Sequence, residues 1–294
     1  MDISIIFVNY KTKDLTINAI RSVFEKTEGV DFEIFVVDNN SQDGSIEAIE
    51  KEFPNINIIK SPINSGFGAA NNLAIKQAKG KYIFCLNTDT LLINNAIKIM
   101  YDFMEKEENK NIAVCGGALY NNDGQACTCG GNLPSIYDIL WKFGLRTLFK
   151  NKYKKYSICL TTDDCNNYEN IGYITGADIF FRRSVLDEIG VFDENIFMYF
   201  EETDLCKRIR DKNYDIKLVK DAKIIHLEGK SNNNTLNKKL ISKTSEFYYF
   251  NKHCPHQVWF IKGLYVILYF IDGIINHNKD SKNLFRYILM NCKD

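Results

Sequence analysis

The sequence lacks a net charge, because its 37 basic and 37 acidic side chains cancel over 294 residues. No overall field therefore draws the chain to nucleic acid or repels it from an anionic membrane, and we expect no nucleic-acid partner. The nine cysteines include no CxxC pair, and Cys85 and Cys115 lie inside apolar runs where a thiol acts as a small hydrophobe. We expect reduced cysteines and a cytoplasmic protein.

Membrane-directing segments are also missing. The first residues, MDISIIFVNYK, lack the basic region, apolar stretch and small-residue cleavage site of a signal peptide. The most apolar segment, residues 258–275, is interrupted by Lys262, Gly263 and Asp272. We therefore expect this segment to be too short to cross a bilayer, although it can lie on the surface of one.

The first third of the chain alternates two kinds of apolar pattern. Short runs rich in Ile, Val and Phe predict strands at residues 4–8, 33–37, 56–59, 82–86 and 112–114. Apolar residues recur at helical spacing over residues 14–27, 45–53, 68–79 and 94–107. This alternation predicts a parallel α/β sheet that is covered on both faces. Ligands bind beyond the carboxyl ends of such strands, where the sequence has Asn9, Asp38, Ser61 and Asp89.

The rest of the chain is less regular. Residues 120–170 lose the periodicity, which predicts long loops and short helices. A second ordered block covers residues 173–225, and the last seventy or so residues are predicted to be helical. No internal repeat is visible.

Two polar motifs follow predicted strands. VVDNNSQDGS contains Asp38 and a turn that opens a helix, which a βα turn with capping residues explains on its own. NSGFGAANN places Gly66 and Gly68 before a helix, where backbone amides can approach a phosphate or a sugar. It is a weak dinucleotide fingerprint, because Asn71 replaces the third glycine.

The run YIFCLNTDTLLI has four polar residues in the middle of a buried strand pattern. A carboxylate at a strand end is more often a helix cap than a metal ligand. However, the oxygen of Asp89 suits Mg²⁺ or Mn²⁺, and such cations bind through one or two protein ligands together with substrate phosphates.

The densest signal is the block at residues 175–209, followed by IIHLEGKS. Glu201 and Glu202 begin a predicted helix, where the helix dipole favours carboxylates. Adjacent helix residues point about 100° apart, so the two cannot both face one site. His226 ends an apolar run, and a lone histidine there is usually satisfied by a hydrogen bond.

Taken in order, FVNYKT, VVDNNSQDGS, NSGFGAANN, LNTDT, TGAD, EETDLC and HLEGKS resemble the inverting family 2 glycosyltransferases, and among them the rhamnosyltransferase-like members. The resemblance covers residues 3 to about 231. It implies an α/β GT-A fold, the nucleotide-diphospho-sugar transferase fold, with a Rossmann-like mixed sheet flanked by helices. The implied domains are a glycosyltransferase domain at residues 1–231 and a C-terminal helical extension at residues 232–294. The first has a nucleotide-sugar-binding half, 1–119, and an acceptor and catalytic half, 120–231.

The resemblance also implies a donor site. Asp38 would contact the nucleotide base, Asn9 would line the same pocket, and Asn87 would lie near the ribose. The full set of implied donor-binding residues is Val8, Asn9, Tyr10, Asp38, Asn40, Asn64, Gly66, Gly68, Asn71, Asn87, Thr88, Gly176, Ala177, Asp178 and Lys230.

The same resemblance implies that Asp89 holds a divalent metal, Mg²⁺ or Mn²⁺, with His226 as a second ligand. Glu202 falls at the position of the catalytic base, and Glu201 is the alternative. Two departures stand out: the family's DxD is NTD here, and its Glu-Asp pair is Glu201-Glu202.

Glycosyl transfer from a nucleotide donor needs a metal to neutralise the leaving diphosphate and a carboxylate to deprotonate the acceptor alcohol. The predicted reaction moves a sugar, first choice rhamnose from dTDP-rhamnose, to a saccharide acceptor on a lipid-linked surface polysaccharide intermediate. Two alternatives stay open. A nucleotidyltransferase that makes nucleotide sugars would need a glycine-rich loop, which FVNYKTKD lacks. The other is a non-catalytic sugar-nucleotide-binding protein.

WKFGLRTLFKNKYKKY, residues 141–156, holds six Lys or Arg among aromatics. Together with residues 258–275 it predicts peripheral contact with the inner face of the plasma membrane. A solvated loop, with a helix that packs on the catalytic domain or on a second subunit of a homo-oligomer, explains the same residues equally well.

Overall fold

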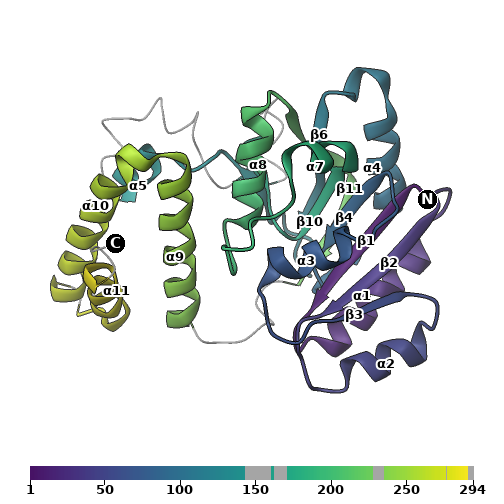
Figure 1. Ribbon diagram of the computed structural model, residues 1–294, viewed down its shortest axis with the longest axis horizontal. Coiled ribbons are helices and arrows are strands. Elements are labelled where there is room, and N and C mark those ends of the chain that lie inside the picture. The colour runs from purple at the N-terminus through teal and green to yellow at the C-terminus, as the bar shows by residue number, and fades with distance from the viewer. Residues whose placement is uncertain (143–159, 162–170, 228–234, 276, 291–294) are drawn as a thin grey trace. The chain divides into compact units, whose positions relative to one another are not determined.

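The computed structural model (Figure 1) describes the chain except residues 143–159, 162–170, 228–234, 276 and 291–294. It divides into two compact units. One, here called the sheet unit, comprises Met1–Asn132, Cys159–Phe197 and Glu201–Asn232. The other, here called the helical unit, comprises Leu133–Ile158, Met198–Phe200 and Asn233–Asp294. The predicted division of residues 1–231 at residue 119 stays a prediction.

The first half of the sheet unit alternates strands and helices, as predicted. Its mutually parallel strands are β1 (Ile3–Asn9), β2 (Phe32–Asp38), β3 (Asn57–Lys60) and β4 (Tyr82–Leu86). The helices that follow them are α1 (Lys13–Lys26), α2 (Ser45–Glu52), α3 (Phe67–Ile75) and α4 (Ala96–Glu105). The interior strands have continuous apolar sequences because helices cover both faces of such a sheet.

The large sheet is mixed, in the order β3-β2-β1-β4-β10-β6-β11-β5. Four strands complete it: β5 (Thr90–Leu92), β6 (Ile112–Tyr120), β10 (Asp178–Arg182) and β11 (Asp215–His226). β10 lies antiparallel between β4 and β6, and β5 pairs antiparallel with β11. The five strands expected from the alternation are mutually parallel, as predicted, since β4 and β6 are both antiparallel to the β10 strand between them. The antiparallel strands β10 and β5 were not among them, and they make the sheet mixed, as the resemblance implied. Long-range pairing, which a local pattern does not contain, decides the difference.

A second, small sheet lies in the region for which only loops and short helices were expected. It has the order β8-β7-β9, from β7 (Thr128–Gly131), β8 (Leu160–Thr161) and β9 (Tyr173–Ile174). Strands of two to four residues are too short to show alternation, so periodicity missed them. The sheet unit also has a 3₁₀ turn at Glu107–Asn109 and the helices α7 (Arg183–Ile189) and α8 (Glu201–Asp211).

The helical unit contains α5 (Ile136–Lys142), α9 (Thr235–His253), α10 (Pro255–Ile275) and α11 (Lys279–Met290). In Figure 1, α9, α10 and α11 form one group, and each of the three packs against the other two. Their shared core is Ile139, Tyr249, Phe250, Val258, Ile261, Tyr265 and Ile288. The C-terminal residues are helical, as predicted.

Helix α10 corrects one expectation. It continues without a break through Lys262, Gly263 and Asp272, over 21 residues. An 18-residue window of α10 has a mean hydropathy of 1.8, so by length and composition alone the helix can cross a membrane. The expectation that this segment is too short was wrong, because isolated charges do not interrupt a helix whose remaining residues are apolar.

Candidate active site

Asn9, the last residue of β1, organises the carboxyl ends of the first two strands. Its Nδ2 donates to Asp38 Oδ1 (2.8 Å) and to Ser41 Oγ (3.0 Å). Its Oδ1 accepts hydrogen bonds from the hydroxyls of Thr12 and Thr16. Because Asn9 is fully buried, it orients Asp38 from beneath and does not form a ligand-facing wall itself. Ser41, which the sequence did not single out, donates its backbone N–H to Asp38 Oδ2 (3.1 Å).

Asn39 joins the two polar motifs that follow β2 and β3. Its Nδ2 donates to Asn64 Oδ1 (2.8 Å) and to the Gly66 carbonyl (3.1 Å), and its Oδ1 accepts from the Ser65 amide. The next residue, Asn40, has a left-handed φ of 65°, which asparagine tolerates in a turn. Asn39 was missed because its partners are distant in the sequence.

The two glycines of NSGFGAANN are needed for packing. A Cβ on Gly66 would lie 2.0 Å from the Phe197 carbonyl oxygen, and one on Gly68 would lie 3.0 Å from Phe192 Cβ and 3.4 Å from Glu201 Cβ. The Phe67 amide already donates to the Phe197 carbonyl (3.1 Å). The segment before α8 therefore fills the space beside these two Cα atoms, and the expectation that the backbone amides approach a phosphate or a sugar stays a prediction.

Asp89 and His226 meet at the edge of the sheet. The antiparallel pairing of β5 with β11 sets His226 opposite Thr90, and this register brings His226 Nε2 to 3.4 Å from Asp89 Oδ1. The Leu227 amide also donates to the Asp89 carbonyl (2.8 Å). The structure thus brings together the two predicted metal ligands, which are far apart in the sequence.

This pair of side chains fits a hard divalent cation whose coordination shell is completed by oxygen atoms of a substrate. Both side chains are half-buried, at 17% exposed for Asp89 and 15% for His226. Within the described part of the chain, no group of three or more His, Cys, Asp or Glu side chains gathers at one point. One carboxylate and one imidazole match the small number of protein ligands that such a cation takes when phosphate oxygens complete its coordination.

The NTD motif is also tied to TGAD. The Asn87 amide donates to the Ala177 carbonyl (2.9 Å), and the Thr88 hydroxyl lies 3.1 Å from that of Thr12. Thr88 is buried and Asn87 is half-buried. The resemblance placed Asn87 and Ala177 in one site, and the hydrogen bond brings them together.

Glu201 and Glu202, at the start of α8, lie in different environments. Glu202 is half-buried, and its Oε1 accepts a hydrogen bond from the Thr203 hydroxyl (3.2 Å). Glu201 is 4% exposed, and its Oε2 has no hydrogen-bond partner among the described residues. Burial raises the pKa of Glu202, and burial together with the Glu202 charge raises the pKa of Glu201 well above its usual range. Leu205 of the same helix is fully buried in the core.

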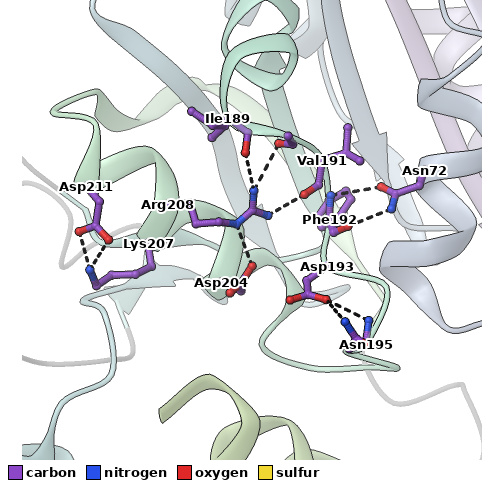
Figure 2. Close-up of polar contacts among 11 residues, drawn as sticks. Asn72, Ile189, Val191, Phe192, Asp193, Asn195, Asp204, Lys207, Arg208 and Asp211 are labelled. Carbon is purple, nitrogen blue, oxygen red and sulfur yellow. Dashed lines mark hydrogen bonds and ion pairs between the residues drawn. The ribbon is translucent and has the colours of Figure 1, made fainter. Parts of the chain in front are cut away.

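An arginine that sequence reasoning missed holds α8 in place. Figure 2 shows the Arg208 guanidinium donating to the carbonyls of residues 189–191 and to Asp204 Oδ2 (3.0 Å). Asp204 is fully buried, so this pairing also satisfies a buried carboxylate. Asn72 of α3 binds the same segment: its Nδ2 donates to the Phe192 carbonyl, and its Oδ1 accepts from the Phe192 amide. The helix that carries Glu202 is thereby fixed to the helix that follows NSGFG.

Two further predicted donor-site residues have buried positions. Asp178 is fully buried and accepts a hydrogen bond from the Gly117 amide, and burial raises its pKa well above the usual range. Asn71 is fully buried and donates to the Phe67 carbonyl (3.0 Å). A ligand does not reach either side chain in this conformation, so both act here as internal supports.

The remaining predicted donor-site residues are more accessible or lie elsewhere. Tyr10 is 40% exposed, with Lys11 Nζ 5.5 Å from the centre of its ring. Val8 and Gly176 are half-buried. Lys230 lies outside the described residues.

Comparison with known proteins identifies the family of this chain. Residues 4–190 match the family model described as glycosyl transferase family 2. That match spans more than half of the chain, and the protein belongs to this family.

Several relatives are similar over most of this chain. An uncharacterized glycosyltransferase, YfnE of Bacillus subtilis, is 26% identical, covering 79% of this chain and 66% of the relative. The N-acetylglucosaminyl-diphospho-decaprenol L-rhamnosyltransferase of Mycobacterium tuberculosis is 22% identical, covering 67% of each chain. The chain thus spans about two thirds of the length of these relatives.

Solved structures share the fold. The mannosyltransferase PcManGT from Pyrobaculum calidifontis, in complex with GDP-Man and Mn²⁺, has a TM-score of 0.59 at 12% identity, covering 98% of this chain and 84% of that one. GalNAc-T7 with UDP, GalNAc and Mn²⁺ has a TM-score of 0.56 at 14% identity, covering 85% and 50%. The fold is therefore that of the GT-A glycosyltransferases, as the sequence resemblance implied.

Proposed function

We propose that this glycosyltransferase is an inverting enzyme that moves rhamnose from dTDP-rhamnose to a saccharide acceptor carried on a lipid-linked surface polysaccharide intermediate. The M. tuberculosis relative is an L-rhamnosyltransferase named for a diphospho-decaprenol acceptor, and it supports the donor sugar and the lipid-linked acceptor. A further relative, the minor teichoic acid biosynthesis protein GgaA of B. subtilis, is 25% identical over 85% of this chain and supports a surface polymer.

The observation that carries the proposal is the approach of His226 to Asp89 at the sheet edge, within 3.4 Å. These two side chains would hold Mg²⁺ or Mn²⁺ together with the donor diphosphate. A bound divalent cation supplies positive charge that stabilises a leaving diphosphate. The two GT-A structures that resemble this chain are complexes with Mn²⁺, which supports the choice of a divalent metal.

Asp38 and its supports form the nucleotide end of the proposed site. Asn9 and Ser41 hold both carboxylate oxygens of Asp38 through hydrogen bonds of 2.8 and 3.1 Å. A carboxylate so oriented can accept hydrogen bonds from the N–H groups of a pyrimidine base. Asn64, Asn87 and Thr88 complete this end of the proposed site.

Glu202 is the proposed general base. A base must take the proton of an acceptor hydroxyl, and its efficiency is best when its pKa is close to the working pH. Burial raises the pKa of Glu202 in that direction, and its half-buried side chain stays accessible. Glu201 is the weaker candidate because it is almost fully buried beside Gly68. One base opposite the leaving group implies inversion at the anomeric carbon.

Binding of the nucleotide is tested by thermal shift with dTDP, UDP and GDP, each with and without Mn²⁺. A ligand that binds only the folded chain raises its melting temperature. We expect the largest rise with dTDP and Mn²⁺, and loss of the metal-dependent part in Asp89→Ala. Equal shifts with and without Mn²⁺ would contradict the metal site, and a preference for UDP or GDP would contradict the choice of donor.

Turnover separates this proposal from its rivals. Family membership favours glycosyl transfer over nucleotide-sugar synthesis and over non-catalytic binding. Release of dTDP from dTDP-rhamnose in the presence of a saccharide acceptor supports the proposal. Pyrophosphate release from a nucleoside triphosphate would instead support a nucleotidyltransferase. We also propose a cytoplasmic location, which the free thiols of Cys85, Cys115, Cys206 and Cys254 favour.

A further inference from the structure

Helix α10 has an apolar exposed face. Its buried side, with Val258, Ile261 and Tyr265, packs into the core of the helical unit. Its exposed side carries large apolar side chains that are 45–68% exposed, and we call these the α10 face: Trp259, Phe260, Ile267, Phe270, Ile271, Ile274 and Ile275. Large contiguous apolar patches of this kind mark interaction surfaces.

The α10 face is broad and its own residues are uncharged, with Lys262 Nζ 5.0 Å from the centre of the Trp259 ring at its margin. Trp259 and Ile275 are each eight residues from Ile267, which at about 100° per residue puts them about 80° to either side of it. The face therefore spans an arc of about 160°, wider than the narrow seam of a two-stranded coiled coil. Lys262 and Asp272 project about 140° away from Ile267 on the same count, outside this arc.

Exposed cationic side chains lie on α11, the helix that packs against α10. Helix α11 crosses the end of α10 where Lys282 meets Gly273, and the ring of Phe285 lies 5.4 Å from that of Phe270. On the same exposed side of α11 are Lys282 and Arg286. Broad apolar and aromatic surface with adjoining Lys and Arg is the pattern of helices that bind anionic lipid interfaces.

The packing of α10 favours a position in the plane of the membrane over one across it. Only 22% of the most apolar window of α10 is buried in the structure, so most of the helix has no protein cover. However, α10 packs against α9 and α11, which carry Lys239, Lys243, Lys282 and Arg286. A crossing orientation would take these charges into hydrocarbon, which is costly. An in-plane orientation buries the α10 face alone.

We propose that the helical unit docks on a bilayer with anionic headgroups, with the α10 face in the acyl-headgroup boundary and Lys282 and Arg286 against lipid phosphates. This inference goes beyond glycosyl transfer and does not depend on the identity of the donor or acceptor. It assigns the C-terminal helices to a lipid surface, and a second copy of the chain is the competing occupant.

The test is co-sedimentation of the full chain with vesicles, without donor or acceptor. We expect binding to vesicles of equimolar phosphatidylglycerol and phosphatidylcholine at low salt, and weaker binding to pure phosphatidylcholine. The triple variant Phe260→Ser, Ile267→Ser, Ile274→Ser changes three exposed residues spaced along one line of the α10 face. It should lower the partition coefficient by about tenfold or more, because three apolar side chains no longer enter the interface.

Two further variants control the experiment. Ile63→Ser removes an isoleucine of the sheet unit that is 63% exposed, and it should bind vesicles as the wild type does. Lys282→Glu combined with Arg286→Glu should remove the preference for phosphatidylglycerol and keep the weak binding to phosphatidylcholine. Far-UV circular dichroism checks that each variant is folded.

Three outcomes would overturn the proposal. The first is a wild-type chain that does not sediment with anionic vesicles. The second is vesicle binding that the triple variant does not weaken. The third is a dimer in analytical ultracentrifugation that the triple variant dissociates, without vesicle binding, which would assign the face to a second copy. Since the assay contains no substrate, a failed glycosyl-transfer proposal leaves these results unaffected.

Discussion

The two units differ in their most prominent feature, which is a set of enclosed polar groups in one and an exposed apolar helix face in the other. The sheet unit encloses polar groups at its strand ends and satisfies them, as with Asn9 beneath Asp38 and Arg208 beside Asp204. The helical unit instead exposes apolar groups such as Phe260 and Ile274. Enclosing a polar group costs desolvation that only well-placed hydrogen bonds offset. Internal polar groups therefore indicate a built site, and external apolar groups indicate a surface made for contact with something other than water.

The largest effect is expected when a carboxylate is removed from the strand ends of the sheet unit. Asp89→Ala should abolish sugar transfer and the metal-dependent part of diphosphate binding, because His226 alone leaves no anionic ligand for the cation. Donor turnover and Mn²⁺-dependent thermal shift measure the two effects. Asp221→Ala, which removes an exposed carboxylate from the same β11 strand as His226, is the matched control and should behave as wild type. Full activity of the wild-type enzyme in excess chelator would contradict the metal role.

The next largest effect is expected at the start of α8. Glu202→Gln keeps the size and removes the proton acceptor, so turnover at saturating donor should fall roughly a hundredfold to ten-thousandfold while donor binding survives. Glu201→Gln should cost less, since that side chain is buried. The reverse order of effects would mean that the base is Glu201, and normal rates in both variants would contradict the inverting mechanism.

The raised pKa of Glu202 predicts how the turnover rate depends on pH. The base works only when deprotonated, and burial raises the pKa of Glu202. The rate at saturating donor should therefore fall as the pH is lowered through a pKa above the usual range of a glutamate. A profile of turnover against pH measures this limb, and an acid limb at the ordinary glutamate pKa would argue against Glu202 as the base in a buried environment.

Two neighbouring residues of α8, Lys207 and Arg208, allow an exposed ion pair to be compared with a buried one (Figure 2). Arg208→Ala removes the ion pair to the buried Asp204 and the hydrogen bonds to the carbonyls of residues 189–191, and should lower the free energy of unfolding by about 3–5 kcal/mol. Lys207→Ala breaks the pair with Asp211, whose carboxylate is 56% exposed, and should change it by less than about 1 kcal/mol. Urea denaturation measures both. Equal losses in the two variants would contradict the claim that the Arg208–Asp204 pair stabilises the fold more than the Lys207–Asp211 pair.

The buried carboxylate of Glu201 predicts a dependence of stability on pH. Its pKa is raised in the folded state, so the folded chain binds this proton more tightly than the unfolded chain does. The stabilisation is therefore complete below the unfolded pKa of a glutamate and is lost as the pH rises through the raised folded pKa. Glu201→Gln cannot titrate and should lose less stability between acidic and mildly alkaline pH than the wild type. Denaturation at both pH values checks this, and identical losses would contradict the assignment.

The smallest effect is expected on the outside of the helical unit. Ile267→Ala removes a side chain that is 51% exposed and should change the free energy of unfolding by at most about 0.5 kcal/mol. Ile261→Ala, on the fully buried side of the same helix, should cost about 2–5 kcal/mol. Comparable costs at both positions would mean that the α10 face is covered within the protein in solution.

Sequence patterns predicted the elements that depend on local periodicity. The four strands and four helices of the first third lie within a few residues of their predicted places, because each combines a buried face with nearby turn residues. The small sheet and the antiparallel insertion of β10 were not predicted, since both depend on pairing between distant segments. Of the site, the sequence indicated Asp89, His226 and Glu202 as candidates, but it did not indicate Asn39 or Arg208.

The sequence by itself determined which residue types stand at the strand ends and which segments alternate, because these follow from spacing along one chain. Only the tertiary structure decided that His226 reaches Asp89, that Asp178 is sealed beneath the site, and that Glu201 is buried while Glu202 stays accessible. It also decided that α10 turns its apolar residues outward. Burial and contact belong to the surfaces that distant segments present to each other, so no local pattern contains them.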